Sequence, residues 1–300
     1  MRRNYGIPKS TDSSFFVEPS NKTPTHDVVL LANVPDSWSL QHFLDRAMRV
    51  VGQAHPSKGT HIATGRKSSP AVSDLWSTLG YAPDTIIHND TNFVASKLIW
   101  SCRAPLAHPW LTRRSLSLLH PDSLSGLSVA DRKIVMYMTR SNGITLNGGR
   151  RVVNEDLLLL ELQRLLDRRG EGEVLQVFNH DDFADMKTLM KHFHLHVKAI
   201  IGPHGGALYH HLWTGPDTLV VEFQPISRPD LTFYESARLR EQPYAVLMLD
   251  SLDDEHNMDV DIPAVIQILE DRLGSRATKN DTLRIVYDWE GYELHTAALE

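Results

Sequence analysis

A glycine-rich segment, residues 200–208, carries the clearest chemical pattern in this sequence of 300 residues. It follows the apolar run 197–201, which predicts a buried strand, and it precedes a predicted helix. Free backbone N–H groups and the helix dipole favour an anion at such a junction, and glycines let the backbone approach a phosphate closely. The segment therefore predicts a phosphate-binding loop, although a tight turn without a ligand fits the same spacing. The candidate residues are Gly202, His204, Gly205, Gly206 and Ala207.

Two charged residues are expected at the same edge of the sheet as this loop. Arg140 directly follows the predicted strand 133–138, and Glu222 lies in the predicted strand 219–223. Ligands of parallel α/β sheets bind at the carboxyl ends of the strands. An arginine there can bind phosphate oxygens with two N–H groups, and an acid commonly receives sugar or ribose hydroxyls. Singly, each is typical of an ordinary surface charge, but together with the loop they predict a ligand site.

Short apolar strands alternate with amphipathic helices along the chain, which is typical of parallel sheets covered on both faces. The pattern is clearest in the second half, where Asn154 is a candidate cap for a helix from Glu155 to Arg169. In the first half, Asp36 and Ser37 are candidate caps for a helix ending near residue 52. Other predicted strands are 28–31, 85–88, 174–178, 243–249 and 284–287, and other predicted helices are 73–79, 183–193 and 262–273.

Composition excludes several functional classes. The apolar fraction is 41%, the charged fraction is 23% and the formal net charge is −6, so there is no electrostatic case for binding nucleic acid or an anionic membrane. No apolar run approaches the length of a membrane span. The single cysteine, Cys102, cannot form an intrachain disulfide and is typical of a small buried apolar residue. Sequons at Asn21, Asn89 and Asn280 are weak evidence for a secretory location.

A series of motifs resembles glycosyltransferase family 61, which includes EGF-domain O-GlcNAc transferases and plant xylosyltransferases. The resemblance spans roughly residues 26–225 and is most specific over 200–223. Residues 39–45, Ser-Leu-Gln-His-Phe-Leu-Asp, also resemble the N-terminal helix motif of that family. The motifs are Arg132-Lys133-Ile134-Val135, Thr139-Arg140, Arg150-Arg151-Val152-Val153-Asn154-Glu155, Ile201-Gly202-Pro203-His204-Gly205-Gly206-Ala207-Leu208 and Pro216-Asp217-Thr218-Leu219-Val220-Val221-Glu222-Phe223.

The resemblance implies an α/β, GT-B-like fold, with two Rossmann-type domains whose mostly parallel sheets face each other across a cleft. We expect a lead-in over residues 1–25, an acceptor-side domain over 26–125, a nucleotide-sugar-binding domain over 126–275 and a tail over 276–300. Family members usually begin with a membrane anchor and a longer N-terminal region. Neither is seen here, so we expect a truncated or short divergent first domain. A location in the lumen of the endoplasmic reticulum or Golgi is implied by the resemblance alone, and a soluble cytoplasmic protein stays an alternative.

The resemblance also implies inverting transfer of GlcNAc, xylose or arabinose from a UDP-sugar to a hydroxyl of a glycoprotein or polysaccharide. Inversion needs a base for the acceptor hydroxyl and positive or N–H groups for the departing diphosphate. Arg140, His204 and the amides of Gly205 and Gly206 suit the second role. His42 and Asp45, three residues apart on a predicted helix, are the candidate base and its partner.

Two other interpretations remain open. Sixteen histidines, among them His192, His194 and His196, allow a histidine-bound metal, although the first of these falls in a predicted helix. No Asp-x-Asp pattern indicates a cation site, so a divalent cation is possible but not indicated, and no cofactor is expected. The second alternative is a catalytically inactive relative that binds a nucleotide and acts as a scaffold.

Overall fold

The computed structural model describes residues 20–34, 36–100, 108–119, 132–141 and 149–275. These residues contain two all-parallel β-sheets, and the parts of the molecule around the first and the second sheet are called its first and second halves. The first sheet has four strands in the order β3-β2-β1-β4, and the second has five in the order β6-β5-β7-β8-β9. This topology confirms the expected α/β class and is consistent with two Rossmann-like domains, as in the GT-B fold. The strands are β1 (Thr25–Leu31), β2 (His61–Ala63), β3 (Ile86–Ile87), β4 (Val94–Ile99), β5 (Ile134–Tyr137), β6 (Val174–Val177), β7 (Val197–Pro203), β8 (Leu219–Pro225) and β9 (Tyr244–Leu249).

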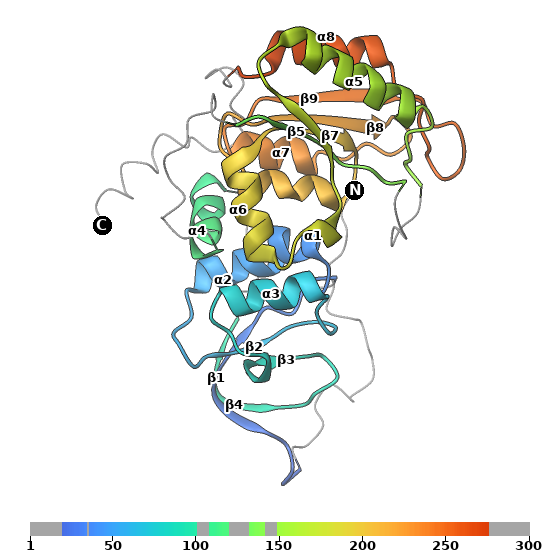
Figure 1. The fold of residues 1–300 in the computed structure, drawn as a ribbon. Coiled ribbons are helices and arrows are strands. Elements are labelled where there is room, and N and C mark those ends of the chain that lie inside the picture. Colours follow the sequence, from blue (N-terminus) through green and yellow to red (C-terminus); the bar gives the residue numbers. More distant parts are fainter. Residues whose placement is uncertain (1–19, 35, 101–107, 120–131, 142–148, 276–300) are drawn as a thin grey trace.

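Helices cover both faces of the second sheet (Figure 1). Side chains alternate along β5, so Val135 packs under α5 and α8 while its neighbour Met136 faces α6. The helix α5 begins and ends where the sequence predicts, and Gly170 ends it in a left-handed conformation with φ 64°. The helices of this half are α5 (Glu155–Arg169), α6 (Met186–His196), α7 (Thr232–Leu239) and α8 (Ile262–Arg272), with the 3₁₀ helices η6 (His180–Asp182) and η7 (Gly206–Trp213).

The first predicted helix of the chain is interrupted in the structure. Its first turn begins after Ser39, because Asp36 has a left-handed φ of 65° and the Ser37 hydroxyl instead lies 3.2 Å from that of Thr64. The prediction that Asp36 or Ser37 caps the helix is therefore wrong. The helices of this half are α1 (Leu40–His42), the π-helical turn η2 (Phe43–Ala47), α2 (Met48–Ala54), α3 (Pro70–Thr78), η3 (Pro83–Thr85) and α4 (Pro109–Leu119).

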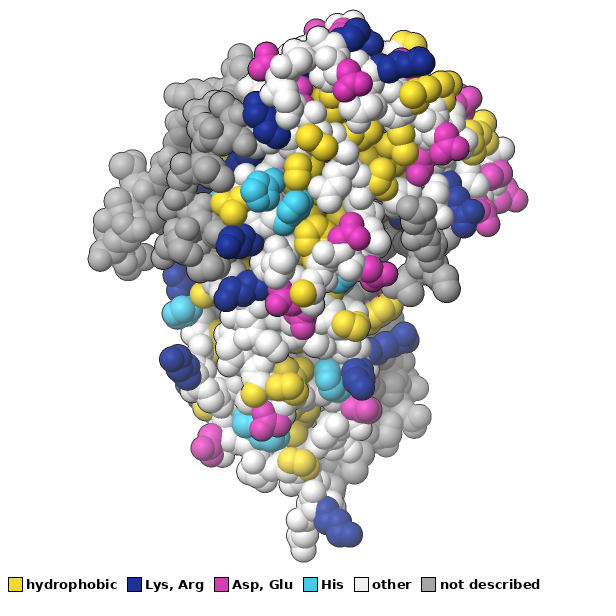
Figure 2. Space-filling view, viewed as in Figure 1, with side chains coloured by type: hydrophobic (Ala, Val, Ile, Leu, Met, Phe, Trp, Pro, Cys, Tyr) yellow, Lys and Arg dark blue, Asp and Glu magenta, His cyan; other side chains and the backbone are white. Residues whose placement is uncertain are grey.

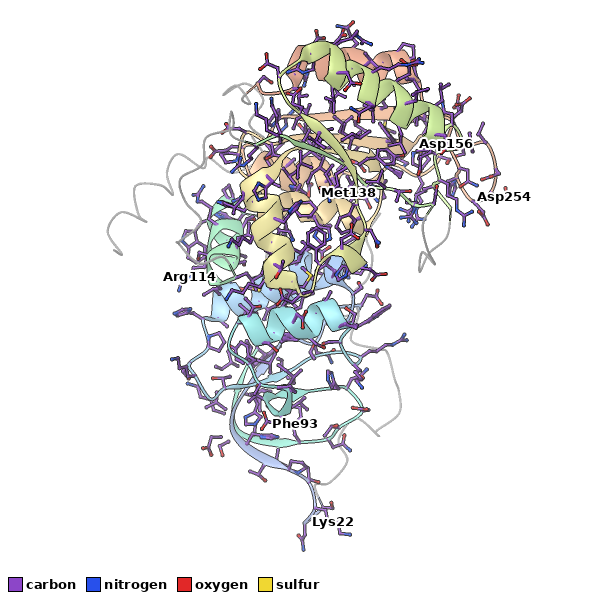
Figure 3. All side chains as sticks on the ribbon, viewed as in Figure 1. Lys22, Phe93, Arg114, Met138, Asp156 and Asp254 are labelled. Carbon is purple, nitrogen blue, oxygen red and sulfur yellow. The ribbon has the colours of Figure 1, made fainter. Side chains whose placement is uncertain are left out.

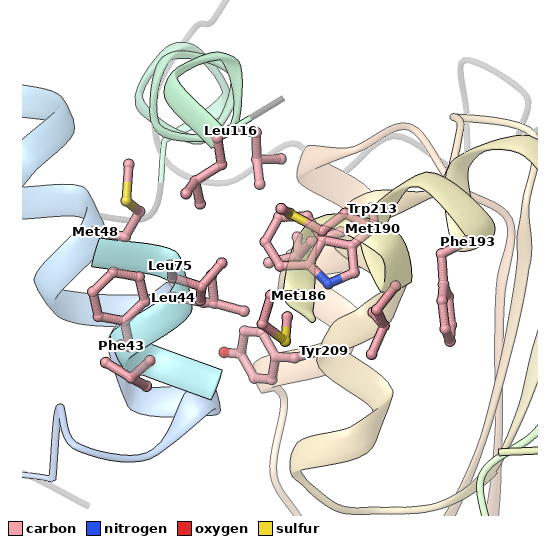
Figure 4. Close-up of a cluster of buried hydrophobic side chains, with 14 of the residues drawn as sticks. Phe43, Leu44, Met48, Leu75, Leu116, Met186, Met190, Phe193, Tyr209 and Trp213 are labelled. Carbon is pink, nitrogen blue, oxygen red and sulfur yellow. The ribbon is translucent and has the colours of Figure 1, made fainter. Parts of the chain in front are cut away.

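One apolar core joins the two halves. Phe43 from η2 and Leu75 from α3 belong to the same buried cluster as Met186 from α6 and Trp213 from η7 (Figure 4). Each of these four side chains is at most 2% exposed. Buried apolar area of this kind contributes about 25 cal/mol per Å². Packing therefore fixes the helices that follow β1 against the helices that flank β7.

Several local predictions need correction or lie outside the described residues. The helix α4, which begins at Pro109, was not predicted. The helix expected from Ala207 is a 3₁₀ helix, and the edge strand β4 was not predicted. Residues 1–19, the predicted strand 284–287, Cys102 and Asn280 lie outside the described residues.

On the face shown in Figure 2, lysines and arginines are interspersed with aspartates and glutamates. Among the described residues, no helix is both long enough and apolar enough to cross a membrane.

Met138, just after β5, lies toward the middle of the molecule, whereas Lys22 and Phe93 lie at the far end of the first half (Figure 3). The carboxyl edge of the second sheet is thus turned toward the first half.

Candidate active site

The carboxyl ends of β5, β7 and β8 meet at one edge, so the glycine loop, Arg140 and Glu222 come together as predicted. The register pairs Tyr137 with Ile201 and Gly202 with Glu222. Gly202 is needed for this approach, because a Cβ atom there would lie 2.6 Å from the main-chain oxygen of Met138. The loop is thus packed directly against the strand that leads to the arginine.

The side chain of Arg140 lies against the loop. Its side chain is buried, and its Nε donates to the Gly149 oxygen at 2.8 Å. One of its terminal nitrogens, Nη1, lies over Gly205, where a Cβ atom would approach it to less than 3.0 Å. Burial lowers the pKa of Arg140, and the neighbouring Arg151 and Arg228 lower it further. The glycine at 205 therefore leaves the space that the guanidinium occupies.

Glu155 fixes the turn that carries Arg140. The Thr139 hydroxyl donates to Glu155 Oε1 at 2.7 Å, and the Ser141 hydroxyl donates to Oε2 at 3.0 Å. The Tyr137 hydroxyl also donates to Oε2, at 3.3 Å. Glu155 is the first residue of α5, where a carboxylate also interacts favourably with the helix dipole. One side chain thus ties the end of β5 to the start of α5.

Arg150 is a second arginine at this edge, to which the sequence pattern assigned no role. It is 3% exposed, and its Nε and Nη2 atoms are buried without a hydrogen-bond partner among the described residues. Burial lowers its pKa to about 10, helped by Arg140 and Arg228 and opposed by Asp230 and Glu222. Buried N–H groups without partners are costly, and a ligand anion would satisfy them. The sequence feature that could have identified Arg150 as a site residue is its position in the motif 150–155.

A short ladder of backbone hydrogen bonds holds Arg150 in place. Its N–H donates to the Glu255 oxygen at 2.9 Å, and its φ is 57°. Gly149 precedes it with φ 63°, and a Cβ atom on Gly149 would overlap the Glu255 oxygen. Asn154 is the N-cap residue of α5, as predicted, but its side chain makes no capping hydrogen bond. Instead its amide donates to the Val260 oxygen at 2.8 Å and accepts from the Val260 nitrogen at 3.0 Å.

His204 and Glu222 form a buried pair. Nδ1 of His204 is hydrogen-bonded to Glu222 Oε1, and the Tyr244 hydroxyl donates to Oε2. Glu222 is 0% exposed, whereas His204 is 8% exposed. The carboxylate was expected at the edge of the sheet, and it lies there behind the imidazole with both oxygens occupied. Burial and the nearby Glu222 raise the pKa of Tyr244 far above its usual value, so its hydroxyl remains a donor.

His42 and Asp45 lie on the first half, beside the loop. His42 Nδ1 is 3.5 Å from Asp45 Oδ2, and the Tyr209 hydroxyl of η7 donates to the same oxygen at 3.4 Å. The side chain of Gln41 lies near Gly206, where a Cβ atom would be 3.6 Å from Gln41 Oε1. The structure therefore brings the candidate base next to the helix that begins at the glycine loop.

The histidines that suggested a metal have other neighbours. His192, His194 and His196 all lie in α6, so they cannot share one face of a strand. His210 accepts from Trp213 Nε1 at 3.0 Å, and His211 bonds to Gln242 at 2.7 Å. Among the described residues, no group of three or more His, Cys, Asp or Glu side chains could hold a metal ion.

Comparison with known proteins identifies the family. The family model for glycosyltransferase 61 matches residues 26–221, which cover both described sheets as far as β8. No curated protein matches the chain. The matched region includes the glycine loop, both buried arginines and the segment with His42 and Asp45. The chain belongs to glycosyltransferase family 61 and is a transferase enzyme that uses a nucleotide-sugar donor.

Proposed function

We propose that this glycosyltransferase takes its sugar from a UDP-sugar and transfers it, with inversion, to a hydroxyl of a glycoprotein or polysaccharide. The observation that carries the proposal is the pair of buried arginines, Arg140 and Arg150, beside a loop of glycine amides. The positive charge of Arg140 lowers the pKa of the buried Arg150, and a diphosphate removes that repulsion. The donor diphosphate then contacts these arginines and the amides of Gly205, Gly206 and Ala207.

The acceptor is activated from the first half. His42 removes the proton of the acceptor hydroxyl, and Asp45, whose Oδ2 lies 3.5 Å from the imidazole Nδ1, stabilises the charged form of the ring. Tyr209 fixes Asp45 from the nucleotide-binding side. The sugar bond to the diphosphate breaks as the acceptor oxygen attacks, and the two arginines and His204 stabilise the departing charge. This assignment needs no metal ion, because the arginines supply the positive charge that a divalent cation would otherwise provide.

The donor sugar in this proposal is GlcNAc, xylose or arabinose. We also propose that the protein works in the lumen of the endoplasmic reticulum or Golgi. The sequons at Asn21 and Asn89 support this location, since both asparagines are exposed and could accept a glycan there.

A screen of UDP-sugars by thermal melting, followed by calorimetry with UDP, tests the proposal. Arg140→Ala should abolish measurable UDP binding, since a truncated charged group typically costs 2–5 kcal/mol. Arg164→Ala is the matched control, because this arginine lies on the exposed face of α5, where Glu161 is its ion-pair partner. Normal UDP affinity in Arg140→Ala would refute the site. UDP binding with no transfer to any acceptor would favour the inactive scaffold.

A further inference from the structure

His204, Glu222 and Tyr244 form a hydrogen-bonded chain that runs from the glycine loop across two strands. Glu222 accepts at both oxygens, from His204 Nδ1 and from the Tyr244 hydroxyl, and Gln224 Nε2 lies 3.4 Å from its Oε1. A carboxylate can only accept, so Nδ1 of His204 must carry a proton. Neutral His204 therefore has its lone pair on Nε2, the nitrogen that points away from Glu222.

The second ring nitrogen of His204 is Nε2. No hydrogen bond from the described residues reaches Nε2, and the ring meets Phe233 edge-on at 5.1 Å between centroids. A lone pair on Nε2 would repel a phosphate oxygen, whereas a protonated Nε2 would donate a charge-assisted hydrogen bond to it. Only the imidazolium form thus suits a diphosphate, and Glu222 behind the ring stabilises that form, as the aspartate does in a catalytic triad.

The charged groups around His204 couple its protonation to the binding of a diphosphate. Arg140 and Arg150 lie at the same edge, so the site already carries two positive charges when no ligand is bound. A bound diphosphate compensates all three cations. Charged and titratable groups from the neighbouring elements are Arg140 after β5, Arg150 and Arg151 before α5, Glu222 on β8, Arg228 and Asp230 before α7, Arg238 on α7, Tyr244 on β9, Tyr209 on η7 and Asp45 on η2.

We propose that binding of a nucleoside diphosphate is coupled to the uptake of one proton by His204, with Glu222 and Tyr244 as positioning residues. This inference rests on the proposed function, because it places the diphosphate at the glycine loop. In this proposal Glu222 acts through His204, because its carboxylate stabilises the imidazolium form of that histidine. It also adds Tyr244, whose hydroxyl occupies the second carboxylate oxygen and so keeps Oε1 directed at the imidazole.

Calorimetry with UDP in buffers of different ionisation enthalpy measures the number of protons taken up. The terminal phosphate of UDP titrates at a pKa of about 6, so the measurement is made at pH 8 and compared between variants. His204→Gln is the reference variant, since its amide can donate near the Nε2 position but does not titrate. We expect wild-type protein to take up one proton more than His204→Gln. Above neutrality, the UDP affinity of the wild-type protein should fall by an additional factor of about ten per pH unit, relative to the affinity of His204→Gln.

Glu222→Gln should not take up the additional proton when UDP binds. Tyr244→Phe keeps the carboxylate, so it should still take up this proton but bind UDP more weakly. If Glu222→Gln does not fold, the comparison of wild type with His204→Gln decides alone. Equal proton numbers in those two proteins, with UDP bound to both, would overturn the coupling and leave the proposed function intact. Failure of wild-type protein to bind UDP would overturn both.

Discussion

Gly205→Ala is a small change that should disable the donor site without altering its charges. Gly205 has an extended backbone, with φ 174° and ψ 167°, so alanine is not excluded by its conformation. Its Cβ atom, however, would overlap Nη1 of Arg140. The loop cannot easily yield, because the Gly205 oxygen accepts from Leu208 at 3.0 Å and the His204 nitrogen donates to Phe223 at 2.8 Å. The guanidinium must therefore move.

The expected magnitude follows from the bond that is lost. Nε of Arg140 stays tied to the Gly149 oxygen, so displacement affects mainly the terminal nitrogens that would face phosphate. A hydrogen bond to a charged group contributes about 1.5–3 kcal/mol. Gly205→Ala should therefore weaken UDP binding roughly ten- to a hundred-fold, since each 1.4 kcal/mol corresponds to about a factor of ten. The overlap should also lower the free energy of unfolding by about 1–3 kcal/mol.

Gly206→Ala provides the matched control in the same loop. A Cβ atom at Gly206 would meet only the Gln41 side chain, at 3.6 and 3.7 Å, which is ordinary van der Waals contact. Calorimetric titration of both variants with UDP, at a temperature well below their melting transitions, gives the comparison. The reasoning is refuted if Gly205→Ala binds UDP as tightly as wild type, or if Gly206→Ala loses as much affinity as Gly205→Ala.

Three further substitutions or conditions test other parts of the structure. Arg150→Met should weaken UDP binding at least tenfold yet leave the urea midpoint unchanged or higher, because it removes buried N–H groups without partners; a marked loss of stability would contradict this. Burial lowers the pKa of His210 to about 3 and of His211 to about 4. The unfolded chain therefore binds more protons below pH 6.5, and stability should fall by about 2 kcal/mol per histidine between pH 8 and pH 5. Urea unfolding at both pH values checks this, and His210→Gln should show a smaller loss. Tyr209→Phe should keep UDP affinity but slow transfer, because only the hydroxyl that holds Asp45 is removed; kcat and UDP affinity measured together separate the two effects.

The elements with strong local signals were predictable from the sequence. Leucines at helical spacing and a glycine after Arg169 define α5 within one residue of its observed ends. The strand β4 was missed because it lies at a sheet edge, where Ser96, Lys97 and Leu98 are exposed and no clear alternation appears. The helix α4 was missed because prolines and serines around it are also typical of loops.

Within the site, proximity was predictable but environment was not. Parallel strands bring their carboxyl ends to one edge, and this rule alone placed Arg140, the loop and Glu222 together. The burial of Arg150 was not predictable, because its backbone is held by hydrogen bonds with residues more than a hundred positions later in the chain. The burial of Glu222 likewise depends on Tyr244, on the neighbouring strand.

The apolar core shared by the two halves keeps the segment with His42 aligned with the glycine loop. Phe43 lies one residue after His42, and its ring is fully buried in the shared core. Tyr209 lies three residues after Gly206 and is packed in that same core, with its hydroxyl on Asp45. Close-packed interiors transmit displacement, because their side chains have little free volume. The positions of the candidate base and the glycine loop relative to each other are therefore set by apolar packing between η2 and η7.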